Sequence, residues 1–213
     1  MGLPLVAALC LIALPHRPLA AEPLSILAFG DSLVAGFGLA DRDGFAPQLE
    51  RALAAEGVEA KVINAGVSGD TTAGGRARLD WSLAGWAAGA GRQLVILELG
   101  ANDMLRGIEP VETRNNLDAM LSRLQASGAT VLLAGMRAAP NLGPDYRAAF
   151  DAIFPELAEK HGVALYPFFL EGVAARPDLN QPDGLHPNAA GVAEIVRRIL
   201  PHVVAALEAD GRG

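Results

Sequence analysis

The chain reads LSILAFGDSL from Leu24 to Leu33, an apolar run that ends abruptly at Gly30-Asp31-Ser32. Short, continuously apolar runs are typical of parallel strands that are covered on both faces of a sheet. A strand that ends at a glycine can present the next hydroxyl at the edge of the sheet, where a nucleophile is accessible. Taken alone, the same Gly-Asp-Ser is more typical of a turn in which Ser32 caps a helix.

Four similar apolar runs follow along the chain, and helical segments alternate with them. The predicted strands are 25–30, 61–66, 94–100, 129–135 and 163–169, and the predicted helices are 44–55, 72–87, 111–126, 144–160 and 188–207. Gly57, Gly128 and Gly162 follow three of these helices, as C-terminal caps do. Five β-α units without a linker or a repeat predict one doubly wound α/β domain, a three-layer sandwich around a five-stranded parallel sheet.

Composition narrows the possible partners. The chain has 213 residues, of which 51% are hydrophobic, and its net charge is −7, so it can build one full core. It contains no run of Lys and Arg, which argues against nucleic acid and anionic membranes as partners. It also lacks cysteine clusters, His-Glu-x-x-His and phosphate-binding or dinucleotide fingerprints, so we expect neither a metal site nor a cofactor.

The first 21 residues differ from the rest of the chain. Residues 3–14 are almost continuously apolar but too short to span a bilayer comfortably, and Leu19-Ala20-Ala21 offers small residues for cleavage. We predict a signal peptide over 1–21, a mature domain over 22–213 and a periplasmic or secreted protein. The basic segment that usually precedes such an apolar run is missing, which leaves an uncleaved membrane anchor as the alternative. The only cysteine, Cys10, would be lost on cleavage.

The ends of the predicted strands bear the residues that could carry chemistry. In doubly wound folds the ligand crevice lies beyond the carboxyl ends of the strands, so Ser32, Gly66 and Asn102 should converge there. A serine hydroxyl needs a base and a third group that orients the base; His186 and Asp183, three residues apart, could supply both.

A tetrahedral intermediate also needs hydrogen-bond donors for its oxyanion. The backbone N–H groups of Ser32 and Gly66 and the side-chain amide of Asn102 could provide three of them. Gly66 has no Cβ and would let the backbone approach a substrate. Each of these motifs alone is more typical of an ordinary turn, but their occurrence together favours a catalytic site.

Four blocks of this sequence resemble those of the SGNH (GDSL) hydrolases. They are Gly30-Asp31-Ser32-Leu33, the turn at Gly66, Gly100-Ala101-Asn102-Asp103 and Asp183-Gly184-Leu185-His186-Pro187. Residues 64–72 and 136–155 are similar to the branch of bacterial periplasmic thioesterase I/protease I/lysophospholipase L1, or arylesterases. The resemblance implies a flavodoxin-like strand order 2-1-3-4-5, with Ser32 as nucleophile, Asp183 and His186 as its partners, and Ser32, Gly66 and Asn102 as the oxyanion hole.

We therefore expect a serine esterase that hydrolyses acyl esters and thioesters through an acyl-enzyme on Ser32. Apolar segments after the third and fourth strands should line its acyl pocket, at Met104, Leu105, Ile108, Pro140 and Leu142. Two alternatives remain: a carbohydrate O-acetyl esterase of the same superfamily, and a non-catalytic binding module on this fold.

Several other side chains are assigned structural roles. Asp31 and Asp103 are expected to fix turns, and Trp81 and Trp86 to pack or to flank the crevice. His161 and His202 have no acidic partner nearby in the sequence, which favours surface or capping roles.

Overall fold

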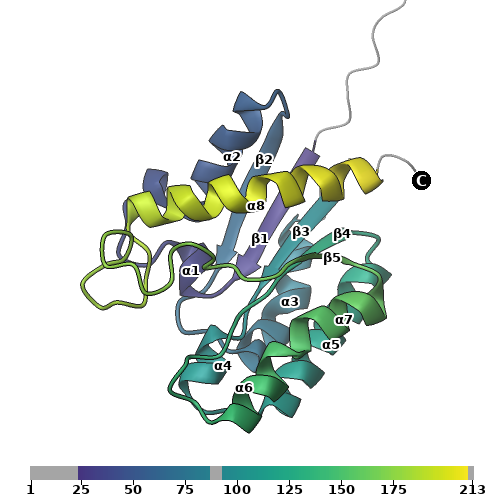
Figure 1. Cartoon of the computed structure of the whole chain (residues 1–213). Helices are drawn as coiled ribbons and strands as arrows, with labels where there is room; N and C mark the ends of the chain where they lie inside the picture. The colour runs from purple at the N-terminus through teal and green to yellow at the C-terminus, as the bar shows by residue number, and fades with distance from the viewer. Residues whose placement is uncertain (1–23, 87–92, 211–213) are drawn as a thin grey trace, which may run out of the picture.

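The computed structural model describes residues 24–86 and 93–210, in which a parallel sheet lies between two layers of helices (Figure 1). The predicted signal segment and Cys10 lie outside these residues. The sheet has five strands in the order β2-β1-β3-β4-β5, and every neighbouring pair is parallel. The predicted fold class and the strand order 2-1-3-4-5 are thereby confirmed. The strands are β1 (Leu24–Gly30), β2 (Ala60–Gly66), β3 (Gln93–Glu98), β4 (Thr130–Ala134) and β5 (Ala164–Tyr166).

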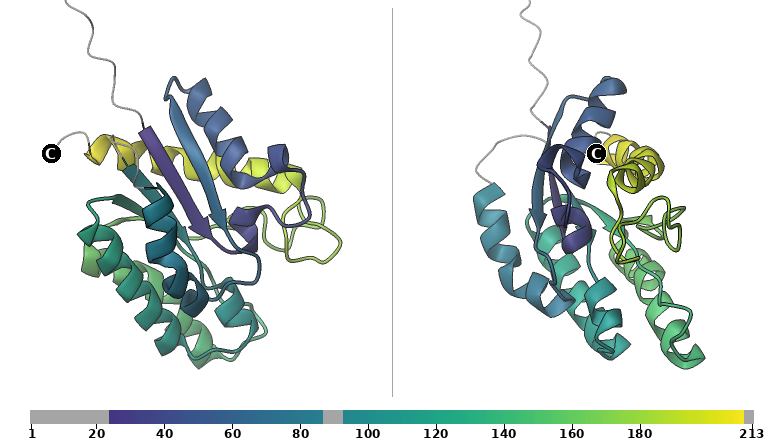
Figure 2. Two further views of the ribbon diagram at one scale, coloured as in Figure 1. Left: turned by 180° about the vertical axis from the view of Figure 1, so that it is seen from behind. Right: turned by 90° about the vertical axis from the view of Figure 1, so that its left-hand side faces the viewer.

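Helices cover both faces of the sheet (Figures 1 and 2). Helices α2 and α8 pack together on one face, and α3, α5 and α7 cover the other. The helices are α1 (Ser32–Ala35), α2 (Phe45–Ala55), α3 (Thr72–Trp86), α4 (Ala101–Leu105), α5 (Pro110–Ala126), α6 (Pro144–Asp151), α7 (Ile153–His161) and α8 (Ala189–Asp210), with a short 3₁₀ turn η1 (Asp41–Asp43). Within 24–86 and 93–210, no helix combines the length and the hydropathy that crossing a bilayer requires.

The apolar runs form the core as expected. The central strands β1 and β3 are buried almost throughout, and Phe29 and Leu97 lie opposite each other near their carboxyl ends. Because these two strands are neighbours, the segments that follow them leave the sheet side by side.

The short helices α1 and α4 were not predicted, and α8 continues to Asp210, beyond the predicted end at 207. Proline or glycine explains three other differences from the predicted ranges. The predicted helix 144–160 is two helices, because Pro155 has no N–H to bond the carbonyl of Asp151, where α6 ends. Strand β5 ends at Tyr166, before Pro167. Strand β3 ends at Glu98 because Gly100 adopts a φ of 122° and turns the chain into α4.

The prediction for His161 was wrong. Its Nε2 lies 2.6 Å from Oδ1 of Asp118, and Lys160 binds the same carboxylate. These two contacts to Asp118 join the end of α7 to α5. The Lys160 hydrogen bond is the main cause that lowers the pKa of Asp118, and the bond to His161 adds to it. Sequence distance hid this contact, since the two residues are 43 positions apart. His202 packs its ring against Tyr166 instead.

The two tryptophans lie away from the crevice. Trp86 is buried and its indole N–H donates to Oγ of Ser25 at 2.7 Å, which ties the end of α3 to the start of β1. Trp81 is 81% exposed on α3. The prediction that either residue flanks the crevice is therefore not met, although Trp86 does pack as expected.

Candidate active site

Ser32 is the first residue of α1, directly beyond the carboxyl end of β1. Asp31 is the N-cap of this helix, and its Oδ1 accepts the backbone N–H of Leu33 at 3.0 Å. The capping role that Ser32 could have had is therefore filled by its neighbour. Its hydroxyl is left to contact a partner from elsewhere in the chain.

That partner is His186. Its Nε2 lies 2.9 Å from Oγ of Ser32, although the two residues are 154 positions apart, and its Nδ1 lies 2.6 Å from Oδ2 of Asp183. The other oxygen of Asp183 accepts the backbone N–H groups of His186 and Leu185. These bonds, led by the one from the His186 backbone, lower the pKa of Asp183 to about 2. The carboxylate is thus charged at neutral pH and can stabilise an imidazolium.

The three predicted oxyanion donors lie at the carboxyl ends of the strands, but they differ in their hydrogen-bond acceptors. The backbone N–H of Ser32 has no acceptor within the part of the chain that is described. The amide of Asn102, in α4, donates one N–H to Oδ2 of Asp31 at 3.0 Å and keeps its second N–H. The N–H of Gly66 donates to Oδ1 of Asn64 at 2.9 Å, so it must exchange or share this partner to bind an oxyanion.

The reason for a glycine at position 66 differs from the predicted one. A Cβ there would lie 2.2 Å from the backbone nitrogen of Ala35 and 2.8 Å from the carbonyl oxygen of Asp31. The absent side chain therefore lets the end of β2 pack against α1, which by itself requires a glycine at this position. The packing holds Gly66 beside the turn that bears Ser32.

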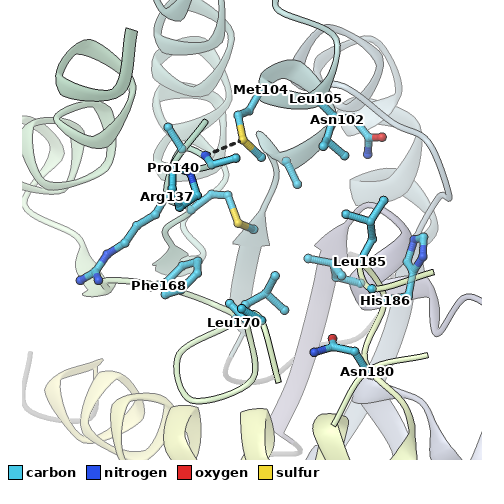
Figure 3. Close-up of a pocket in the computed structure, with 18 of the residues that line it drawn as sticks. Asn102, Met104, Leu105, Arg137, Pro140, Phe168, Leu170, Asn180, Leu185 and His186 are labelled. Atoms are coloured by element: carbon cyan, nitrogen blue, oxygen red, sulfur yellow. Dashed lines mark hydrogen bonds between the residues drawn. The ribbon is translucent and has the colours of Figure 1, made fainter. Parts of the chain in front are cut away.

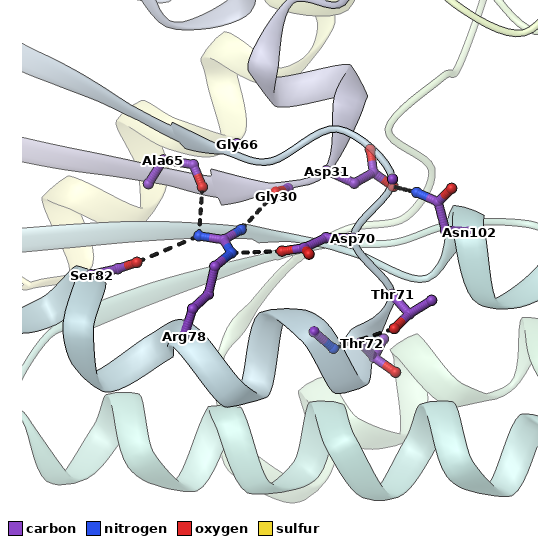
Figure 4. Close-up of polar contacts among 12 residues, drawn as sticks. Gly30, Asp31, Ala65, Gly66, Asp70, Thr71, Thr72, Arg78, Ser82 and Asn102 are labelled. Carbon is purple, nitrogen blue, oxygen red and sulfur yellow. Dashed lines mark hydrogen bonds and ion pairs between the residues drawn. The ribbon is translucent and has the colours of Figure 1, made fainter.

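Arg78 ties the ends of β1 and β2 together, as Figure 4 shows. Its guanidinium donates to the carbonyls of Gly30 and Ala65, both at 2.9 Å, and its Nε lies 2.6 Å from Oδ2 of Asp70. The group also lies over the ring of Phe29, 3.9 Å from its centroid. Those two carbonyls immediately precede Asp31 and Gly66. Arg78 was not among the predicted site residues, because no local pattern relates a helix position to two strand ends.

Beneath Ser32 lie two buried carboxyl groups. Asp31 and Glu98 are both 0% exposed, and the backbone N–H of Asp31 donates to Oε2 of Glu98 at 3.3 Å. The other oxygen, Oε1, has no hydrogen-bond partner in the described chain. Burial is the main cause that raises the pKa of Asp31 to about 6, and burial together with the charge of Asp31 raises that of Glu98 well above its usual range. We conclude that this pair retains a proton at mildly acidic pH.

Asp103 has the structural role predicted for it. It is buried, its Oδ2 accepts the backbone N–H of Thr72 at 2.8 Å, and its Oδ1 accepts the hydroxyls of Thr72 and Thr113. It thereby fixes α4, and with it Asn102, against α3 and α5.

A cavity of about 800 Å³ opens at Ser32 and His186 (Figure 3). In Figure 3, His186 and Asn102 lie at one end of the cavity, and Arg137 and Phe168 at the other. Its wall is mainly apolar. Three of the five predicted acyl-pocket residues line it, namely Met104, Leu105 and Pro140.

The other two predicted residues do not line this cavity. Ile108 offers its carbonyl to the hydroxyl of Tyr146 at 2.8 Å, and Leu142 packs against the core. Sequence reasoning missed lining residues that follow the fourth and fifth strands or adjoin the catalytic residues, namely Leu33, Met136, Phe168, Leu170 and Leu185. Their position at the carboxyl ends of strands was the signal that could have found Met136 and Phe168.

The buried acids predict a pH-dependent stability. A raised pKa means that the folded protein binds more protons than the unfolded chain, so the free energy of unfolding falls as pH rises above the usual value of about 4.5 for Glu98. Glu98→Gln removes this titration. We expect thermal melts to show a difference in Tm, variant minus wild type, that grows from pH 4.5 to pH 8. A difference in Tm that is constant with pH would contradict a raised pKa of Glu98. Glu112→Gln, on the exposed surface of α5, is the matched control and should show no such growth.

Comparison with known proteins relates this chain to a family of lipases and acylhydrolases. The model of the GDSL-like lipase/acylhydrolase family matches residues 28–193. Esterase TesA of Pseudomonas aeruginosa is 41% identical over 177 residues, which cover 83% of this chain and 86% of that protein. Thioesterase 1/protease 1/lysophospholipase L1 of Escherichia coli K12 is 39% identical over 180 residues, or 84% and 82% of the two chains.

A solved structure extends the likeness to the fold. The crystal structure of AlinE4, an SGNH-hydrolase family esterase, superposes with a TM-score of 0.72 at 50% identity and covers 88% of this chain and 98% of its own. The matched family segment includes Ser32, Asn102 and His186. On its sequence, its sheet topology and this likeness, the chain belongs to the GDSL-like lipase/acylhydrolase family.

Proposed function

We propose that the protein is a serine hydrolase that cleaves acyl esters and thioesters through an acyl-enzyme on Ser32. The observation that carries this proposal is the chain of hydrogen bonds from Ser32 through His186 to Asp183, placed at the mouth of an apolar cavity. The names of the related esterase and thioesterase agree with it.

In the first half of the reaction, His186 takes the proton of Ser32 while Oγ attacks the carbonyl carbon. The resulting oxyanion is bound by the N–H groups of Ser32 and Gly66 and by the free N–H of Asn102. His186 then gives its proton to the departing alcohol or thiol, and the acyl group stays on Ser32. In the second half, His186 activates a water that releases the acid and regenerates the hydroxyl.

Each supporting group has a defined task in this scheme. Asp183 holds the imidazole through Nδ1, so that Nε2 faces Ser32. Asp31 fixes the plane of the Asn102 amide and leaves its second N–H available. The acyl chain occupies the cavity beside Met104 and Leu105, where apolar walls replace water.

The two rival functions are less consistent with this site. A non-catalytic binding module has no need of a serine within hydrogen-bond distance of an oriented imidazole. A carbohydrate O-acetyl esterase needs little space for its acetyl group, whereas this cavity measures about 800 Å³ and is walled by apolar side chains.

We further propose that the protein is exported and acts in the periplasm or outside the cell after cleavage of residues 1–21. The support is the apolar segment 3–14 followed by small residues. The N-terminal residue of the exported protein, determined by mass spectrometry, tests this proposal.

Replacement of the nucleophile tests the reaction class. Ser32→Ala should abolish hydrolysis of p-nitrophenyl butyrate and covalent labelling by a fluorophosphonate, because among residues 24–86 and 93–210 no other hydroxyl is paired with His186. Ser122→Ala, which removes an exposed hydroxyl on α5, is the control and should label like wild type. Labelling that persists in Ser32→Ala would identify a different nucleophile.

Asn102→Ala tests the oxyanion hole. Loss of one donor typically lowers turnover by about 10²- to 10³-fold, and we expect this loss in kcat for p-nitrophenyl butyrate with KM little changed. The thermal melt shows whether the variant is folded. Wild-type kcat in a folded variant would remove Asn102 from the mechanism.

A series of acyl chains tests the substrate class. We expect kcat/KM of p-nitrophenyl esters to rise from acetyl to medium chains, because each added methylene buries apolar surface in the cavity. Met104→Asp should flatten this rise and leave the acetyl ester the least affected. Activity confined to the acetyl ester would favour the O-acetyl esterase.

A further inference from the structure

Phe37 is an aromatic residue at the catalytic centre that the mechanism above does not use. It follows α1, five positions after Ser32, and its ring packs against the imidazole of His186 with centroids 4.5 Å apart and planes tilted by 36°. The residue itself is 49% exposed to solvent. Phe37 is not among the residues that line the acyl cavity.

The backbone of Phe37 is held on both sides. Its N–H donates to the carbonyl of Ser32 at 3.1 Å, and its carbonyl accepts the side-chain amide of Gln181 at 2.7 Å. Gln181 in turn donates its backbone N–H to the carbonyl of His186 at 2.7 Å. The position of Phe37 is thus fixed relative to both the nucleophile and the base, although half of its surface faces solvent.

The reaction places the leaving group next to this ring. His186 must protonate the departing atom, which therefore lies within hydrogen-bond reach of Nε2 during acylation. If the acyl chain occupies the cavity, as proposed above, the leaving group extends from Ser32 away from the cavity, on the side of the imidazole. The exposed surface that adjoins the imidazole outside the cavity is that of Phe37.

Exposed apolar side chains elsewhere do not serve this position. In the described chain six large apolar residues are substantially exposed. Besides Phe37 they are Leu105 and Leu185, which line the acyl cavity, Val67, which directly follows Gly66, and Trp81 and Val111, which lie on the outer helices. Phe37 alone among the six contacts the base through its ring.

We infer that Phe37 forms a leaving-group subsite that makes the enzyme select esters with aromatic leaving groups over small alkyl ones. This inference rests on the proposed function. An aromatic ring that stacks on Phe37 in the transition state would favour its substrate by about three- to tenfold in kcat/KM, the usual effect of one aromatic pair. The preference belongs to acylation only, because the leaving group has departed before water attacks.

The test compares two esters that share one acyl group. Benzyl butyrate and methyl butyrate release alcohols of similar acidity and form the same butyryl-enzyme, so only the leaving-group contacts differ. For Phe37→Ala we expect kcat/KM for the benzyl ester to fall about three- to tenfold, whereas the value for the methyl ester stays within about twofold of wild type. Phe37→Tyr keeps the ring and should retain the preference.

Two further measurements make the result specific. The deacylation rate of the butyryl-enzyme, measured after a burst with p-nitrophenyl butyrate, should be unchanged in Phe37→Ala. Trp81→Ala, which removes a more exposed ring far from the cavity, should change neither ester.

The possible outcomes are distinct. An equal loss for both esters with slower deacylation would show that Phe37 only supports His186 and would overturn the inference. Unchanged values for both esters would also overturn it. If wild-type protein hydrolysed neither ester and Ser32 did not react with a fluorophosphonate, the proposed function itself would fail, which is a different result.

Discussion

The contact on which the site depends is that of the Arg78 guanidinium with the ends of two neighbouring strands. It bonds the carbonyls of Gly30 and Ala65 and is neutralised by Asp70, while the side chains of Arg78 and Asp70 are only 19% and 16% exposed. Removal of such a group would take one hydrogen bond from each carbonyl and leave the Asp70 carboxylate without its ion pair in a poorly solvated place. Because Asp31-Ser32 and Gly66 follow these two carbonyls, the pairing of the two strands sets the distance between the proposed nucleophile and a proposed oxyanion donor.

The buried carboxyl groups of Asp31 and Glu98 impose a second constraint on the turn that carries Ser32. Asp31 caps α1, orients Asn102 and faces the buried Glu98, so one carboxyl group links the nucleophile turn to the third block of the site. Burial of two acids so close together opposes folding at neutral pH, since it raises the pKa of both. Active sites often retain such unfavourable groups where they position a functional one, and the amide of Asn102 is the group positioned here.

The loop with the proposed catalytic base comes from the C-terminal part of the chain. His186 and Asp183 follow β5 by a long segment, and the carbonyl of His186 is held by Gln181, which also holds Phe37. The loop that bears the base is therefore tied to the loop that follows the nucleophile. This arrangement defines two sides of Ser32: the apolar cavity proposed to take the acyl group and, next to the imidazole, the exposed ring of Phe37.

Apolar periodicity and turn residues are local signals, and they were enough to predict the alternation of strands and helices and to mark Ser32, Gly66, Asn102, Asp183 and His186 as candidates. What these residues contact depends on how the strands and helices pack. Gly66 meets the backbone of α1, His161 meets Asp118, Arg78 joins two strand ends, and the wall of the cavity includes Phe168 while it omits Ile108. Such contacts join residues tens of positions apart, and their partners follow from strand order and helix packing, which no local pattern encodes.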